Sequence, residues 1–91
     1  MVGRNVRVGR DELDLVAWEG ATLVVVEVRS ARAGAMVDPR ESLTRAKRAR
    51  LRGATIRYAQ SVGARDARID FVAVVDGRVE HFVNAIDFTE T

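Results

Sequence analysis

The stretch ELDLVAWEGATLVVVEVR, residues 12–29, decides how this chain folds. Its two halves, 12–18 and 23–29, are apolar except for charged residues spaced two apart. Runs of this kind are typical of half-buried strands, and Glu19-Gly20 between them is a turn signal. We therefore predict a β-hairpin.

Three carboxylates lie on this hairpin. Side chains alternate between the two faces of a strand, so Glu12 shares a face with Asp14, and Glu27 with Arg29. If opposing residues have an odd sum (14 opposite 27, or 14 opposite 25), all four lie on one face, whereas an even sum separates them. One interpretation is a site for a hard cation such as Mg²⁺, because charge on an apolar sheet is usually paired or metal-bound. The other is a solvated face on which Glu12 and Arg29 form an ion pair.

Length and composition indicate one small globular domain over residues 1–91. The chain is 47% hydrophobic and 31% charged, which is typical of a folded, soluble protein. No apolar run approaches the ~18 residues of a membrane span, and no signal-peptide pattern occurs. The absence of cysteine excludes Cys zinc sites and Cys nucleophiles, and a single histidine excludes a His cluster. We expect a cytoplasmic protein that does not enter a membrane.

The whole pattern predicts an α/β fold, a mixed sheet with one main basic helix. Asp38 is a candidate helix cap, and Thr44 is a second one, so that a short turn could precede the main helix. Gly63 is a candidate helix end, and Asp76-Gly77 a strong hairpin turn. The expected elements are strands over 5–8, 12–18 and 23–29, a loop over 30–35, a helix over about 43–62, strands over 68–75 and 78–86, and an acidic tail over 87–91.

Cations concentrate on the expected helix. Residues 40–57 hold seven cations and one anion, whereas residues 66–91 hold two cations and six anions. A basic stretch of this kind is typical of a surface that contacts a nucleic-acid backbone. The candidate DNA-contacting residues are Arg45, Lys47, Arg48 and Arg52. Lys47 lies on the apolar stripe of the helix, so it either extends to solvent or reaches the carboxylates.

Charged residues on the later strands have a structural interpretation. Arg68 and Asp70 share a strand face and are expected to form an ion pair. His81 is expected to make an ordinary hydrogen bond.

A family resemblance rests on the segments 5–8, 12–15, 26–29, 43–51, 68–70 and 83–86. Together they resemble the YraN-type family of uncharacterised bacterial proteins, which belongs to the restriction-endonuclease-like group and is similar to Holliday-junction resolvases. The resemblance covers nearly the whole chain. It implies a PD-(D/E)xK nuclease core in which Asp14 and Glu27 bind Mg²⁺ or Mn²⁺ and Glu12 supports that site.

The resemblance implies a catalytic set of Glu12, Asp14, Glu27 and Arg29, with Arg29 where the family usually has lysine. It also implies an N-terminal helix with a further glutamate, which this chain is expected to lack. We therefore expect a metal-dependent endonuclease that acts on DNA, branched or structured by analogy. The alternative is a catalytically impaired nucleic-acid-binding or assembly module with the same fold. Apolar surface left by the missing helix predicts a homodimer.

Overall fold

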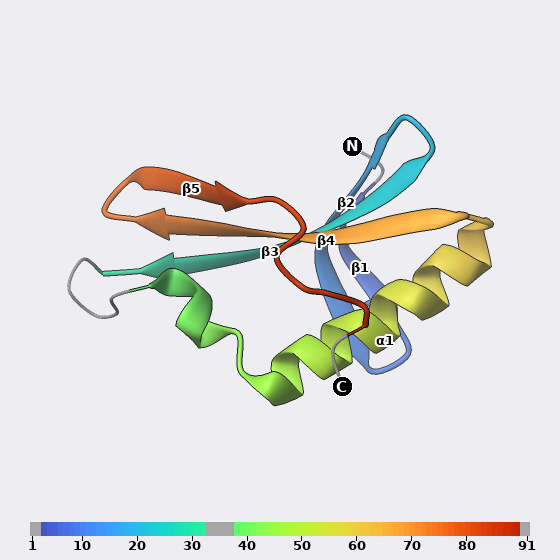
Figure 1. The fold of residues 1–91 in the computed structure, drawn as a ribbon, viewed down its shortest axis with the longest axis horizontal. Coiled ribbons are helices and arrows are strands. Elements are labelled where there is room, and N and C mark those ends of the chain that lie inside the picture. Colours follow the sequence, from blue (N-terminus) through green and yellow to red (C-terminus); the bar gives the residue numbers. More distant parts are fainter. Residues whose placement is uncertain (1–2, 33–37, 90–91) are drawn as a thin grey trace.

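The computed structural model describes residues 3–32 and 38–89 (Figure 1). Within them the chain forms five strands, one α-helix and one short 3-10 helix. The elements are β1 (Gly3–Val8), β2 (Asp11–Glu19), β3 (Thr22–Ala31), η1 (Pro39–Ser42), α1 (Arg45–Val62), β4 (Asp66–Val75) and β5 (Arg78–Phe82). The predicted order of three strands, a helix and two strands is confirmed.

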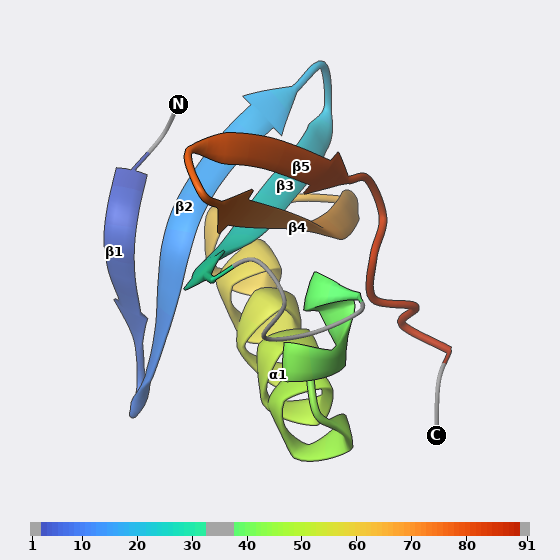
Figure 2. The same cartoon turned by 90° about the vertical axis from the view of Figure 1, so that its left-hand side faces the viewer.

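The strands form one mixed sheet in the order β1-β2-β3-β4-β5. β3 and β4 are parallel, and the other neighbouring pairs are antiparallel. Parallel neighbours need a crossover connection, and α1 supplies it by running beneath the sheet between β3 and β4 (Figures 1 and 2). The predicted α/β class with a mixed sheet is confirmed.

The hairpin of β2 and β3 has the register that the hydrophobic pattern favours. Leu15 pairs with Val26 and Trp18 with Leu23, so the numbers of opposing residues add up to an odd number. This is the register that would place the four charged residues of the hairpin on one face. The turn is at Gly20, whose φ of 60° is unstrained for glycine. Val16 and Val25 therefore lie opposite each other on the same face of the sheet, and both are fully buried.

The helix α1 begins and ends where the sequence predicts. Thr44 is the N-cap, and its side chain accepts a hydrogen bond from the backbone N–H of Lys47. Gly63 ends the helix in the left-handed conformation, with φ of 72°. Leu51 and Ala54 are buried against the sheet.

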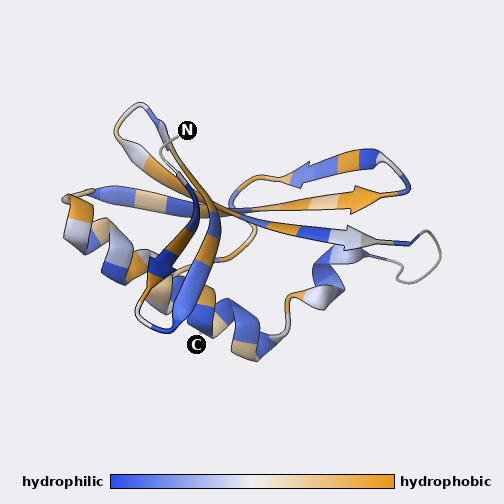
Figure 3. Cartoon of the chain, turned by 180° about the vertical axis from the view of Figure 1, so that it is seen from behind, coloured by the Kyte–Doolittle hydropathy of each residue, from blue (hydrophilic) through white to orange (hydrophobic). Residues whose placement is uncertain are grey.

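One face of the sheet carries the core. Odd-numbered residues of β3 and β4 form much of it, and Val25, Ile69 and Phe71 are fully buried on the face that α1 covers. Hydrophobic residues follow these central strands, whereas α1 alternates between hydrophilic and hydrophobic residues (Figure 3). In the part of the chain described, no helix covers the opposite face, and the side chains of Val79 and Val83 there are 67% and 59% exposed.

The C-terminal segment differs from the sequence-based expectation. β5 ends at Phe82 instead of Ile86, and Asn84 takes a positive φ of 53°, outside the β region of regular strands. The chain then turns under the sheet, where Ile86 is fully buried. Phe88, within the expected acidic tail, packs against the core.

The loop expected over 30–35 begins later than predicted, because β3 continues through Ala31. Positions 33–35 of that loop lie outside the described residues. None of the helices described is long and apolar enough to cross a membrane.

Candidate metal and phosphate site

The regular alternation of β2 breaks at Asp14. Leu13 and Val16 are three residues apart, yet both are fully buried, which strict alternation does not allow. Across the sheet, the position in β1 that would face Asp14 is Asn5, which has a positive φ of 53° and is skipped in the β1–β2 ladder. This irregularity takes Asp14 out of the repeating pattern and turns its carboxyl group toward β3.

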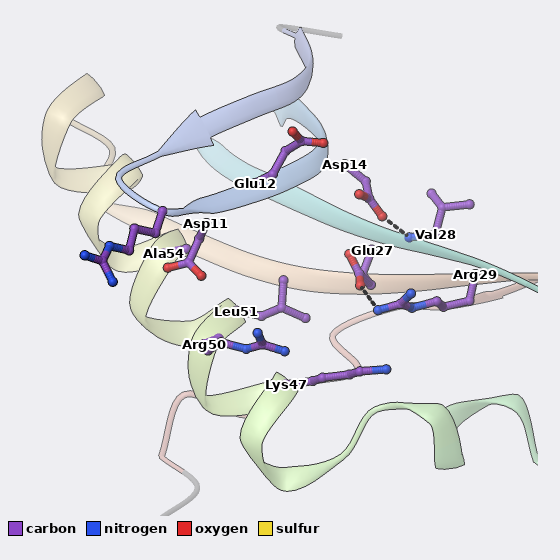
Figure 4. Close-up of a pocket in the computed structure, with 11 residues that line it drawn as sticks. Asp11, Glu12, Asp14, Glu27, Val28, Arg29, Lys47, Arg50, Leu51 and Ala54 are labelled. Atoms are coloured by element: carbon purple, nitrogen blue, oxygen red, sulfur yellow. Dashed lines mark hydrogen bonds and ion pairs between the residues drawn. The ribbon is translucent and has the colours of Figure 1, made fainter.

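The side chain of Asp14 accepts a hydrogen bond at the end of the β2–β3 ladder, where a backbone carbonyl oxygen would usually be the acceptor. Its Oδ2 accepts a hydrogen bond of 2.9 Å from the backbone N–H of Val28 (Figure 4). The carboxyl group is thereby brought near that of Glu27, the residue of β3 that precedes Val28, and acts on the pKa of Glu27. That the two carboxylates share one cation stays a prediction.

Glu27 is a buried carboxylic acid with a raised pKa. The residue is 8% exposed. Burial, followed by the hydrogen bond and negative charge of Asp14, raises its pKa from 4.5 to about 7, while the positive charges of Arg29 and Lys47 lower it in part. The Asp14–Glu27 pair therefore holds a proton at a pH where an isolated glutamate would be fully ionised.

Glu12 does not join this pair. It is exposed, lies opposite Arg7 of β1, and turns its carboxylate away from Glu27 (Figure 4). No group of three His, Cys, Asp or Glu side chains placed to hold a metal ion occurs in residues 3–32 and 38–89. The expected convergence of three carboxylates was wrong, because alternation breaks between Glu12 and Val16.

Arg29 pairs with Glu27 and not with Glu12. Its Nη2 lies 3.1 Å from Oε2 of Glu27, whereas its Nε is buried without a hydrogen-bond partner. The expected alternative, a solvated Glu12–Arg29 ion pair, is therefore replaced by an ion pair along one strand. The Arg29 side chain remains 42% exposed toward the cavity described next.

A cavity of about 340 Å³ opens over the carboxyl pair, between β2, β3 and α1. Four cations face it from different elements, and the remaining residues are acidic or apolar. The lining residues are Arg10, Asp11, Glu12, Asp14, Glu27, Val28, Arg29, Lys47, Arg50, Leu51 and Ala54. Lys47 lines the cavity, and its Nζ donates a hydrogen bond of 3.3 Å to the Ser42 carbonyl oxygen. Its positive charge helps to lower the pKa of Glu27, but its hydrogen bond goes to the backbone and not to a carboxylate.

Sequence reasoning missed two of these cations, Arg10 and Arg50. Arg50 is three residues after Lys47 and therefore on the same side of α1, which is a signal the sequence contained. Arg10 lies in the turn between β1 and β2, and an ion pair of 2.8 Å between its neighbour Asp11 and Arg57 holds this turn against α1. Within the described part of the chain, neither Arg10 nor Arg50 has an ion-pair partner, so both charges are available to a ligand.

The other helix arginines lie on a different side of α1. At about 100° per residue, Arg45, Arg48 and Arg52 fall about 100–160° around the helix from Lys47. Arg48 donates a hydrogen bond to the Leu43 carbonyl oxygen. These three residues line no part of the cavity, and their contact with DNA stays a prediction.

Comparison with known proteins places this chain in a family. Residues 1–74 match the model of the uncharacterised protein family UPF0102. The chain belongs to the UPF0102 family. A UPF0102 protein of Beutenbergia cavernae is 46% identical over 88 residues, covering 89% of this chain and 75% of that protein. A UPF0102 protein of Anaeromyxobacter dehalogenans is 41% identical over 93 residues, covering 96% of this chain and 69% of the relative. The predicted YraN-type family is thus confirmed.

This UPF0102 chain has a second charged cluster on the opposite face of the sheet. Asp70 is 1% exposed, and its carboxylate accepts hydrogen bonds from Arg68 Nε at 3.0 Å and from the Asn84 N–H at 2.9 Å. His81 Nε2 lies 2.9 Å from the same carboxylate. Burial raises the pKa of Asp70, but the hydrogen bonds from Asn84, Arg68 and His81 outweigh it and lower the pKa overall. The predicted Arg68–Asp70 ion pair and the ordinary hydrogen bond of His81 are confirmed, and the cluster is structural.

Proposed function

We propose that this chain is a metal-dependent nuclease domain of the PD-(D/E)xK type that binds DNA and hydrolyses a phosphodiester bond. One observation carries the proposal. The Asp14–Glu27 carboxyl pair lies at the base of a cavity whose other charged walls include Arg10, Lys47 and Arg50. Two carboxylates beneath several cations suit a divalent cation together with a phosphate anion. The mixed sheet with one covering helix agrees with the coarse fold that the family resemblance implies.

The donor set of Asp14 and Glu27 fits Mg²⁺ or Mn²⁺. Burial, followed by the neighbouring Asp14, raises the pKa of Glu27, so a negative charge there is costly unless a positive charge balances it. A divalent cation supplies that charge in place of the proton. Magnesium keeps several waters and commonly uses only one or two carboxylates of the protein. When bound, the cation would stabilise the negative charge that develops on the phosphate.

The cavity cations have distinct roles in this proposal. Arg50 on α1 and Arg10 in the β1–β2 turn hold the phosphate backbone, since neither is engaged elsewhere in the described residues. Lys47 lies nearer the carboxyl pair and orients the phosphate over it. Arg29 is a guanidinium cation, so it stabilises charge and does not act as a base.

A second candidate function is DNA binding with little or no turnover. Two features of the site favour it. The Glu12 carboxylate points away from Glu27, and Arg29 forms an ion pair with Glu27. A site with two firm carboxylates and no lysine at position 29 retains its affinity for phosphate but has fewer groups to activate water. We therefore expect DNA binding to be readily measured and cleavage to be slow.

A cleavage and binding panel with Mn²⁺ over duplex, branched and single-stranded DNA separates the two functions. If the domain is a nuclease, Asp14→Asn and Glu27→Gln should each abolish cleavage. In EDTA, both should leave DNA affinity unchanged or higher, because each removes a negative charge from a cationic cavity. Glu80→Gln, an exposed carboxylate on β5, is the matched control and should cleave normally. Cleavage that survives both cavity substitutions would mean that the chemistry lies elsewhere on the chain.

A further inference from the structure

The guanidinium group of Arg29 is only partly satisfied by its surroundings. Its Nη2 pairs with Glu27 at 3.1 Å, but its Nε is buried without an acceptor. A buried N–H group without a partner costs free energy, because the water that it left is not replaced. The present position of Arg29 thus depends on the attraction of the Glu27 carboxylate.

Arg29 and a cation compete for the same carboxylate. The Glu27 side chain is in contact with Asp14 on one side and Arg29 on the other. A divalent cation bound by Glu27 and Asp14 neutralises the charge that attracts Arg29 and repels its guanidinium group. The side chain is 42% exposed and lines the cavity together with Lys47, so it can turn toward the cavity without unfolding β3.

We propose that cation binding at Asp14 and Glu27 releases Arg29 from Glu27 and makes it a phosphate ligand, so that the cation and the DNA phosphate bind cooperatively. This inference rests on the proposed function, because it uses the same carboxyl pair. Without the cation, the Glu27–Arg29 ion pair keeps one cation of the cavity from the substrate. Because coupling between two ligands is reciprocal, DNA should raise the affinity for the cation by the same factor that the cation raises the affinity for DNA.

NMR of the arginine Nε–Hε groups tests the release directly. Spectra are compared with EDTA, with Mg²⁺, and with Mg²⁺ plus a short DNA duplex that carries uncleavable phosphorothioate linkages. Arg29→Lys assigns the Arg29 signal by its loss. The Arg29 signal should move with Mg²⁺ alone and again with DNA. The signal of Arg50, which has no carboxylate partner among residues 3–32 and 38–89, should move only with DNA.

The same spectra distinguish a failure of the proposed metal site from a failure of the proposed release of Arg29. The backbone N–H of Val28 donates to Asp14, so its signal reports occupation of the carboxyl pair. A Val28 signal that shows no saturable change with Mg²⁺ would remove the metal site and thus the proposed function. A Val28 signal that responds while Arg29 does not would overturn only the release of Arg29.

Cooperativity provides an independent measurement. At constant ionic strength, saturating Mg²⁺ should tighten binding of the phosphorothioate duplex by about tenfold in the native chain, within the usual range of coupling. Arg29→Met should reduce that factor severalfold. Arg50→Met, the matched control, should weaken DNA binding with and without Mg²⁺ but keep the factor. Retention of the full factor in Arg29→Met would overturn the inference.

Discussion

The carboxylate of Asp14 accepts its hydrogen bond from the backbone of Val28, so the proposed metal ligand also closes the end of a β-ladder. Substitutions at Asp14 separate the contribution of this hydrogen bond to stability from the charge that a metal ligand needs. Asparagine keeps an acceptor oxygen and loses the charge, whereas alanine leaves the Val28 N–H without a partner. Asp14→Ala should therefore destabilise the fold by about 1–3 kcal/mol more than Asp14→Asn. Urea denaturation of both variants measures this difference, and equal stabilities would show that the hydrogen bond contributes nothing.

Glu27 should destabilise the fold at high pH when no divalent cation is present. The pKa of Glu27 is about 7 in the folded protein, against 4.5 for an isolated glutamate, so the folded state binds the proton more tightly than the unfolded state. The stability that this proton contributes is full below about pH 4.5 and is lost as the pH rises through 7. Glu27→Gln mimics the protonated acid. In EDTA its stability relative to the native chain should rise by roughly 1–3 kcal/mol between about pH 5 and 8. A difference that does not change with pH would contradict the raised pKa.

The Asp70 cluster should give the opposite pH dependence. Hydrogen bonds from Asn84, Arg68 and His81 lower the pKa of Asp70 below 3.8, so the folded state favours the ionised form. The stability that the carboxylate contributes is present above pH 3.8 and is lost as the pH falls through the lower pKa of the folded state. Asp70→Asn should therefore cost about 1–3 kcal/mol at neutral pH and less in acid. Denaturation curves at the two pH values test this, with exposed Asp76→Asn as the control.

Arginines on the two sides of α1 should differ in their effects on DNA cleavage, although both sides contribute to DNA binding. Arg45, Arg48 and Arg52 are predicted to contact phosphates outside the cavity, and Arg50 a phosphate inside it. Arg45→Gln and Arg50→Gln should each reduce the salt slope of DNA binding by about 1. Arg50→Gln alone should also slow Mn²⁺-dependent cleavage, because Arg50 lines the cavity that contains the carboxyl pair. Binding that is independent of salt would remove the phosphate contacts on both sides.

The homodimer stays a prediction. The sheet face away from α1 leaves Val79 and Val83 more than half exposed, and a second copy would remove this apolar surface from water. Light scattering at high protein concentration should give the mass of a dimer, and Val79→Glu should shift it toward the monomer. A native chain that remains monomeric at the highest concentration would contradict the prediction.

Much of the fold follows from local sequence. The alternation on both sides of Gly20, the cap at Thr44, the Gly63 helix end and the Asp76-Gly77 turn all form as predicted. Each depends on interactions within a few residues, which a sequence displays directly. The closeness of Asp14 and Glu27 also followed, because an odd register was one of only two possibilities.

Only the tertiary structure decided which charged residues share the cavity. Alternation placed Glu12 beside Asp14 and Glu27. Glu12 does line the cavity, but its carboxylate points away from Glu27, next to the irregularity at Asp14 and Asn5. Arg10 entered the cavity because the Asp11–Arg57 ion pair brings the β1–β2 turn against α1. Strand alternation and helix periodicity are properties of one element at a time. The position of a side chain across two elements depends on packing between them, and no local pattern in the sequence encodes that distance.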